Sequence, residues 1–173
     1  MPSYEAAHAR CFVYIFREGL LARVGHDLAL EVRRLRIDVA GDRQRVEASF
    51  DPTSLAVVAA VRDGRHDPRA LSPGDRRDIE RHILEVLEPS RYPDIRFVST
   101  SVEAGTSAAS VRGELALHGV TRPVALRAQR AADVWQSELW LHQPDFGIEP
   151  YRGLMGTLRV KADVRVEVRL PAS

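Results

Sequence analysis

The 173-residue chain is long enough for one domain with a substantial hydrophobic core, because 45% of its residues are hydrophobic. Its 25 Lys and Arg residues nearly balance its 24 Asp and Glu residues, which gives a formal net charge of +1. No global field therefore attracts nucleic acid or an acidic membrane, and we expect no nucleic-acid partner. No apolar run approaches the roughly 20 residues that span a bilayer, so we expect no stable membrane insertion.

The N-terminal segment and the cysteine content bear on the compartment. Residues 1–10 include Glu5 and lack the basic segment followed by an apolar run that marks a secretion signal. Cys11 is the only cysteine, so no disulfide can form within the chain and nothing favours an oxidising compartment. We therefore expect a cytoplasmic location.

Alternation of apolar and polar residues predicts a series of strands along the chain. The predicted strands are 12–16, 28–32, 35–39, 46–50, 95–100, 111–118, 124–129, 135–142 and 158–170. The last is the clearest, because Val, Leu and Ala alternate strictly with charged residues. Such alternation is typical of antiparallel sheets with one buried face, and so many short strands indicate a sandwich or a barrel.

One helix is predicted between the two groups of strands, over residues 75–88. Ser72 is a suitable N-cap, Pro73 suits the first helical position, and Asp75 suits the first turn. Isoleucine, valine and leucine residues follow at helical spacing, and Pro89 ends the helix. We expect this helix to close one end of a barrel or to lie against its wall.

The least regular segment is 51–71, which we interpret as a long excursion over the surface. An apolar stretch within it, residues 55–61, is either another strand or a helical turn. No internal repeat or break in composition indicates a second domain. We therefore expect a single domain over residues 1–173.

Three segments carry a resemblance to a known family. They are RYPDIRFVST at 91–100, VRGELALHGVTRPV at 111–124 and DFGI at 145–148. In order and spacing they resemble blocks of the YceI-like family, which also has a helix before the first block. The resemblance implies an extended lipocalin-like antiparallel β-barrel of about eight strands that holds a polyisoprenoid or similar amphiphile. We expect two departures from the family: no leader peptide, although many relatives are periplasmic, and the sequence RVGHDL at 23–28.

The predicted ligand contacts are residues beside predicted turns and strand ends, together with aromatic residues. The set is His26, Asp27, His118, Trp140, Phe146, Tyr151 and Arg152. Phe146 is expected to plug the barrel, and Gly147 beside it is expected to adopt a backbone conformation that other residues avoid. Residues 151–156 are interpreted as a flexible rim before the last strand.

No catalytic set, metal site or cofactor is predicted. None of the six histidines is paired with another at the short spacing of a zinc site. His26 and Asp27 immediately precede the predicted strand 28–32, and neighbours in a strand point to opposite faces, so their side chains are not arranged for catalysis.

A barrel of about eight strands can be filled by side chains or can hold one small ligand, and the sequence alone leaves both open. Our leading interpretation is binding, transport or storage of a long apolar molecule such as a polyisoprenoid, an isoprenoid quinone or a fatty amide. Two alternatives stay open: a barrel enzyme or metal-binding protein that uses His26 and Asp27, and a structural interaction module with a filled barrel. A homodimer also stays open.

Overall fold

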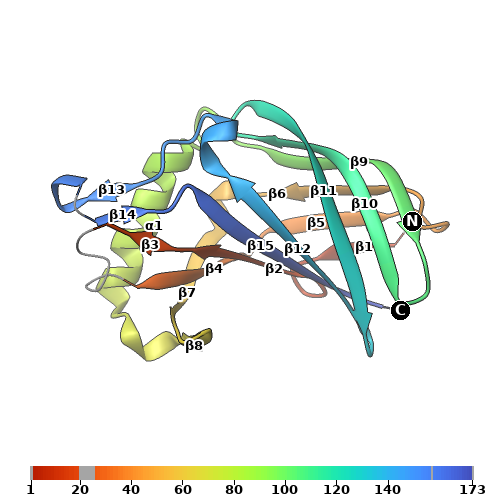
Figure 1. The fold of residues 1–173 in the computed structure, drawn as a ribbon, viewed down its shortest axis with the longest axis horizontal. Helices are drawn as coiled ribbons and strands as arrows, with labels where there is room; N and C mark the ends of the chain where they lie inside the picture. The colour runs from red at the N-terminus through yellow and green to blue at the C-terminus, as the bar shows by residue number, and fades with distance from the viewer. Residues whose placement is uncertain (1, 20–25, 157, 173) are drawn as a thin grey trace.

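The computed structural model describes residues 2–19, 26–156 and 158–172 (Figure 1). In this part of the chain twelve strands form one antiparallel sheet in the order β1-β5-β6-β9-β10-β11-β12-β15-β2-β4-β7-β8. Their bounds are β1 (Ser3–Glu5), β2 (Arg10–Ile15), β4 (Asp27–Val32), β5 (Leu35–Val39), β6 (Val46–Phe50), β7 (Leu55–Arg62), β8 (Arg65–Asp67), β9 (Ile95–Ala104), β10 (Ala108–Leu117), β11 (Val120–Ala131), β12 (Val134–His142) and β15 (Asp163–Pro171).

A second, three-stranded sheet lies at the end of the molecule opposite the chain termini (Figure 1). It contains β13 (Arg152–Gly153), β14 (Leu158–Val160) and β3 (Arg17–Glu18). Short 3-10 helices occupy η1 (Pro52–Ser54), η2 (Pro68–Ala70), η3 (Gln143–Phe146) and η4 (Leu154–Gly156).

The large sheet curls into a barrel because three long strands bend. The two halves of each bent strand carry separate names. β4 continues into β5, and β7 continues back into β6, with the ladder kept across the bend: Arg33 N donates to Ser54 O (3.2 Å) and Asp51 N donates to Arg34 O (3.0 Å). β1 likewise continues into β2, since they pair with β5 and β4 respectively. With each bent strand counted once, eight positions surround the barrel and β8 is an edge hairpin of β7. The predicted antiparallel barrel is confirmed.

Helix α1 (Pro73–Leu87) lies at the end of the barrel where β7 separates from β9. Ser72 and Asp75 form a capping box at its start, and Glu88 ends it in the left-handed conformation. Glu80 accepts a hydrogen bond from Val57 N (3.0 Å) and Arg76 donates to Val57 O (3.1 Å). These side chains satisfy backbone groups of β7 that have no strand beside them there, so the helix closes this end.

Three sequence predictions are corrected. Residues 51–71 are not a surface excursion, because β7 lies within them and is packed in the sheet. The predicted strand 158–170 is two strands, β14 and β15, that belong to different sheets. The strand predicted at 124–129 begins earlier, at residue 120, which leaves residues 118 and 119 as the turn before it.

The segment predicted as a flexible rim, residues 151–156, holds β13 and η4.

Two apolar clusters line the barrel on different sides. One is centred on β2, β4 and β5, with Ala9, Cys11, Val32, Leu35 and Ile37 buried. The other joins β9 and β10 to the segment after β12, with Phe97, Val111, Leu115, Phe146 and Ile148 buried. The space between the two clusters is where the candidate site lies.

Candidate functional site

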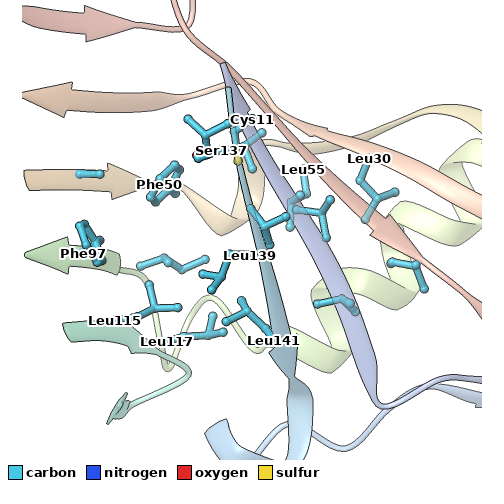
Figure 2. A pocket seen from close by; sticks show the side chains of 18 of the residues that line it. Cys11, Leu30, Phe50, Leu55, Phe97, Leu115, Leu117, Ser137, Leu139 and Leu141 are labelled. Atoms are coloured by element: carbon cyan, nitrogen blue, oxygen red, sulfur yellow. The ribbon is translucent and has the colours of Figure 1, made fainter. Parts of the chain in front are cut away.

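The barrel encloses a cavity of about 790 Å³ that is lined chiefly by apolar side chains. The lining comes from the inward faces of nearly every barrel strand and from one face of α1. Figure 2 shows Cys11 and Leu30 on one side of this space, Phe97 and Leu115 on the other, and Leu139 between them. Ligand pockets commonly measure about 300–1,000 Å³ and are mostly apolar, so the cavity has the size and character of a binding site.

The cavity owes part of its volume to a row of small inward side chains. Ala104 on β9 is paired with Ala109 on β10, which is paired with Ala128 on β11, which is paired with Ser137 on β12. All four line the cavity. Four adjacent strands therefore present at most two heavy atoms beyond Cα at this level, which leaves space that larger residues would fill.

The polar lining residues gather mainly at the α1 end of the cavity. Arg17, His26, Asp75, Asp78, His82, Tyr151 and Arg159 lie there. Tyr4 and Arg43 belong to the strands and turn at the other end, and Ser137 and Gln143 lie on and after β12. Two of the acids have partners nearby, because Ser72 donates to Asp75 (2.7 Å) and Arg81 to Asp78 (3.3 Å). The cavity is therefore apolar along its length and polar at one end.

Three of the predicted ligand residues line the cavity: His26, Phe146 and Tyr151. Phe146 is 3% exposed and packs in the β9–β10 cluster, and Gly147 beside it has φ +68°, as expected for the turn that carries the ring inward. Tyr151 stacks on His82 of α1, with ring centroids 4.6 Å apart. These three positions suit contact with a bound molecule.

Asp27, Trp140 and Arg152 are not part of the cavity lining. Asp27 accepts a hydrogen bond from Arg17 N (2.9 Å), so it faces away from neighbouring His26 as the strand geometry predicts. Trp140 lies on the outer face of β12, is 54% exposed and stacks on Phe16 at 5.6 Å. Arg152 is exposed on β13. The prediction of ligand contacts at these residues finds no support in the cavity geometry.

His118 also lies outside the cavity, at a corner where two of the motif blocks meet. Its ring is 4.2 Å from that of Tyr92, and its Nε2 is 3.5 Å from a carboxylate oxygen of Glu88. Gly119, with φ +75°, packs so closely that a Cβ there would lie 2.7 Å from Tyr92 Cε1. Tyr92, His118 and Gly119 therefore pack the end of α1 against the β10–β11 hairpin, which is a structural role.

A second motif position is also explained by packing. A Cβ on Gly113 would lie 2.6 Å from the Phe97 ring and 2.5 Å from Val98 O. Phe97 lines the cavity and lies across this glycine at the bulge between β9 and β10. Only glycine admits the ring in that position.

Several lining residues were not predicted as ligand contacts, among them Trp135, His82 and Cys11. Alternation on strand 135–142 gives Trp135 the inward face, and His82 lies three residues from Ile79 on the apolar face of the helix, so both were accessible to pattern analysis. Burial raises the pKa of the Cys11 thiol to about 12, with a further rise from the charge of Glu31. The thiol is therefore held neutral as part of the apolar wall.

Among residues 2–19, 26–156 and 158–172, no group of three or more His, Cys, Asp or Glu side chains is arranged to hold a metal ion. Within the same ranges, no helix has both the length and the apolar character needed to cross a bilayer.

Comparison with known proteins places this barrel in a family. The family model described as "YceI-like domain" matches residues 26–172. A UPF0312 protein of Pseudomonas putida is 37% identical over 101 residues, 51% of this chain and 52% of that protein. A UPF0312 protein of Vibrio cholerae is 29% identical over 116 residues, 60% of each chain. The match thus spans about half the length of the Pseudomonas relative.

Solved structures support the same fold at low sequence identity. Burkholderia cenocepacia BcnA superimposes with a TM-score of 0.65 at 12% identity, over 97% of this chain and 98% of that one. The Campylobacter jejuni YCEI protein gives a TM-score of 0.52 at 12% identity over 79% of each chain. The motif blocks, the curled antiparallel sheet and the family match agree, and the chain belongs to the YceI-like domain family.

Proposed function

We propose that this protein binds and carries one long apolar or amphiphilic molecule, such as a polyisoprenoid, an isoprenoid quinone or a fatty amide, inside the barrel. The observation that carries the proposal is the apolar cavity of about 790 Å³ between the two core clusters. A barrel that served only as a scaffold would gain stability by filling this space, since unfilled volume forfeits packing contacts.

The shape of the lining favours a chain-like guest with one polar end. Burial of about 20 CH2 equivalents contributes roughly 16 kcal/mol, and an association cost of about 8 kcal/mol leaves enough for micromolar binding without a charged contact. The polar residues near α1 offer partners for a head group, with His26 and Tyr151 from the predicted set and His82 and Arg159 beside them. The guest's chain would then extend toward Cys11 and Trp135.

The two tryptophans of β12 provide a direct test. Trp135 lines the cavity and Trp140 lies on the outer face of the same strand. In the Trp140→Phe variant, Trp135 is the remaining tryptophan, and we expect brominated stearamide or an isoprenoid quinone to quench it saturably at about one equivalent. The Trp135→Phe variant keeps Trp140 and is the matched control.

Quenching of Trp135 with little change at Trp140 would support a guest inside the barrel. Equal quenching of both residues would indicate surface adsorption and count against the proposal. No saturable quenching of Trp135 by any of these chains would overturn it and favour a structural module.

A further inference from the structure

The hairpin formed by β13 and β14 projects at the α1 end of the barrel, away from the chain termini (Figure 1). Met155 lies in its turn, with a relative exposure of 104% and φ +59°. A bulky residue seldom adopts this left-handed conformation, and a fully exposed thioether gains nothing from packing. Neither backbone preference nor burial among the residues that the structure describes accounts for this methionine.

Four cationic residues lie in or beside the strands of this hairpin and of β3. Arg152 and Arg159 are paired across β13 and β14, Arg17 lies on the adjacent β3, and Lys161 follows β14. The acidic residue within these strands is Glu18, opposite Arg159. We call Arg17, Arg152, Met155, Arg159 and Lys161 the hairpin patch. These four cations and Glu18 sum to a formal charge of +3, in a chain whose total is +1; Asp27, which accepts from Arg17 N, and Asp75 and Asp78 of α1 lie on neighbouring elements.

The hairpin patch borders the polar end of the cavity. Arg17 and Arg159 belong to both the patch and the cavity lining. A Cβ on Gly153 would lie 3.2 Å from Tyr151 Cε1, and Tyr151 stacks in turn on His82 of α1. Tyr151 therefore lies between the hairpin and His82, so a surface bound to the hairpin would lie close to the polar end of the cavity.

We propose that the hairpin patch docks the barrel on an anionic lipid bilayer, with the cations at the head groups and Met155 in the acyl boundary. An exposed apolar tip flanked by cations matches the charge and polarity of that interface. Docking itself needs no guest. Transfer of a guest between bilayer and cavity rests on the proposed function, because water is a poor medium for a long apolar chain.

Vesicle flotation tests the docking. We expect the protein to float with vesicles of phosphatidylcholine and phosphatidylglycerol, to remain behind with phosphatidylcholine alone, and to be released as salt is raised. Arg152→Gln combined with Lys161→Gln removes two cations that do not line the cavity, and should lower vesicle affinity about 25-fold, about fivefold for each. Met155→Ser should lower it by up to about tenfold.

The matched control is Arg112→Gln combined with Arg127→Gln. It removes the same charge from exposed positions on β10 and β11, and should change vesicle affinity far less than the hairpin pair. Equal losses for the two pairs would overturn the proposal, because they would mean attraction by total charge alone. Salt-sensitive binding to a single-stranded oligonucleotide that exceeds binding to the anionic vesicles would overturn it as well.

Failure of docking and failure of the proposed function are separable. If the protein does not bind vesicles but a guest still quenches Trp135, the docking proposal fails and guest binding stands. If vesicles bind but Trp135 is never quenched, docking stands and the proposed function fails. Each hairpin variant should retain full Trp135 quenching.

Discussion

Replacement of Ala128 by Phe tests whether the barrel is hollow. Ala128 lies in the row of small side chains, between Ala109 and Ser137, and faces the cavity. A phenyl ring there occupies the space of about five CH2 equivalents of guest, so we expect guest affinity to fall by about 4 kcal/mol, or roughly a thousandfold in Kd.

In a hollow barrel, the Ala128→Phe substitution should raise the stability of the guest-free protein while it lowers guest affinity. In an empty apolar cavity the ring finds unfilled volume, so the guest-free protein should gain about 0.5–2 kcal/mol in the free energy of unfolding. In a filled barrel the ring would have to displace its neighbours, at a cost of about 1–3 kcal/mol. Stability and binding must therefore change in opposite directions if the account is right.

Urea unfolding of extracted protein, followed by circular dichroism, gives the stability, and Trp135 quenching in the Trp140→Phe background gives the affinity. Ala125→Phe on the same strand is the control, because Ala125 is exposed on the outer face and should leave both quantities nearly unchanged. Loss of stability in Ala128→Phe with unaltered guest affinity would refute the reasoning.

Two further predictions concern packing and chemistry of the wall. Gly113→Ala should destabilise the fold by about 1–3 kcal/mol in urea, because its Cβ would overlap the Phe97 ring, whereas Gly41→Ala has open space and should cost much less. Cys11, with a pKa of about 12 against an ordinary 9.0, has about one thiol in 10⁴ ionised at pH 8, so its alkylation in the native protein should be about a thousandfold slower than in urea. A bound guest should slow it further, and fast native alkylation would contradict its place in a buried wall.

Alternation of apolar and polar residues predicted most of the barrel because most of its strands have one buried face and one solvent-facing side. β5 and β6 match the predicted bounds, and β12 is longer by one residue. β7 was left open between a strand and a helical turn for a physical reason: Ala56, Val57, Ala59 and Ala60 are all buried, so both of its faces are covered. A third apolar cluster lies on the outer side, with Phe12, Tyr14 and Ala29 buried and Val58 and Val61 against it, and it removes the alternation there.

The candidate site was harder to predict because proximity to a turn does not say which way a side chain points. His118 lies at the end of a predicted strand yet packs on Tyr92, and Arg152 lies at the predicted rim yet faces solvent. The alternation of side chains between the two faces of a strand was the better guide, since it places Trp135 inward and Trp140 outward. The resemblance identified the fold, but its glycines and Tyr92 serve packing between elements.

Native mass spectrometry of freshly expressed protein, before and after organic extraction, tests the central claim most directly. The account predicts an added mass of several hundred daltons at one copy per chain, lost on extraction and restored by added polyprenoid, quinone or fatty amide. A bare polypeptide mass that none of these additions changes would contradict it.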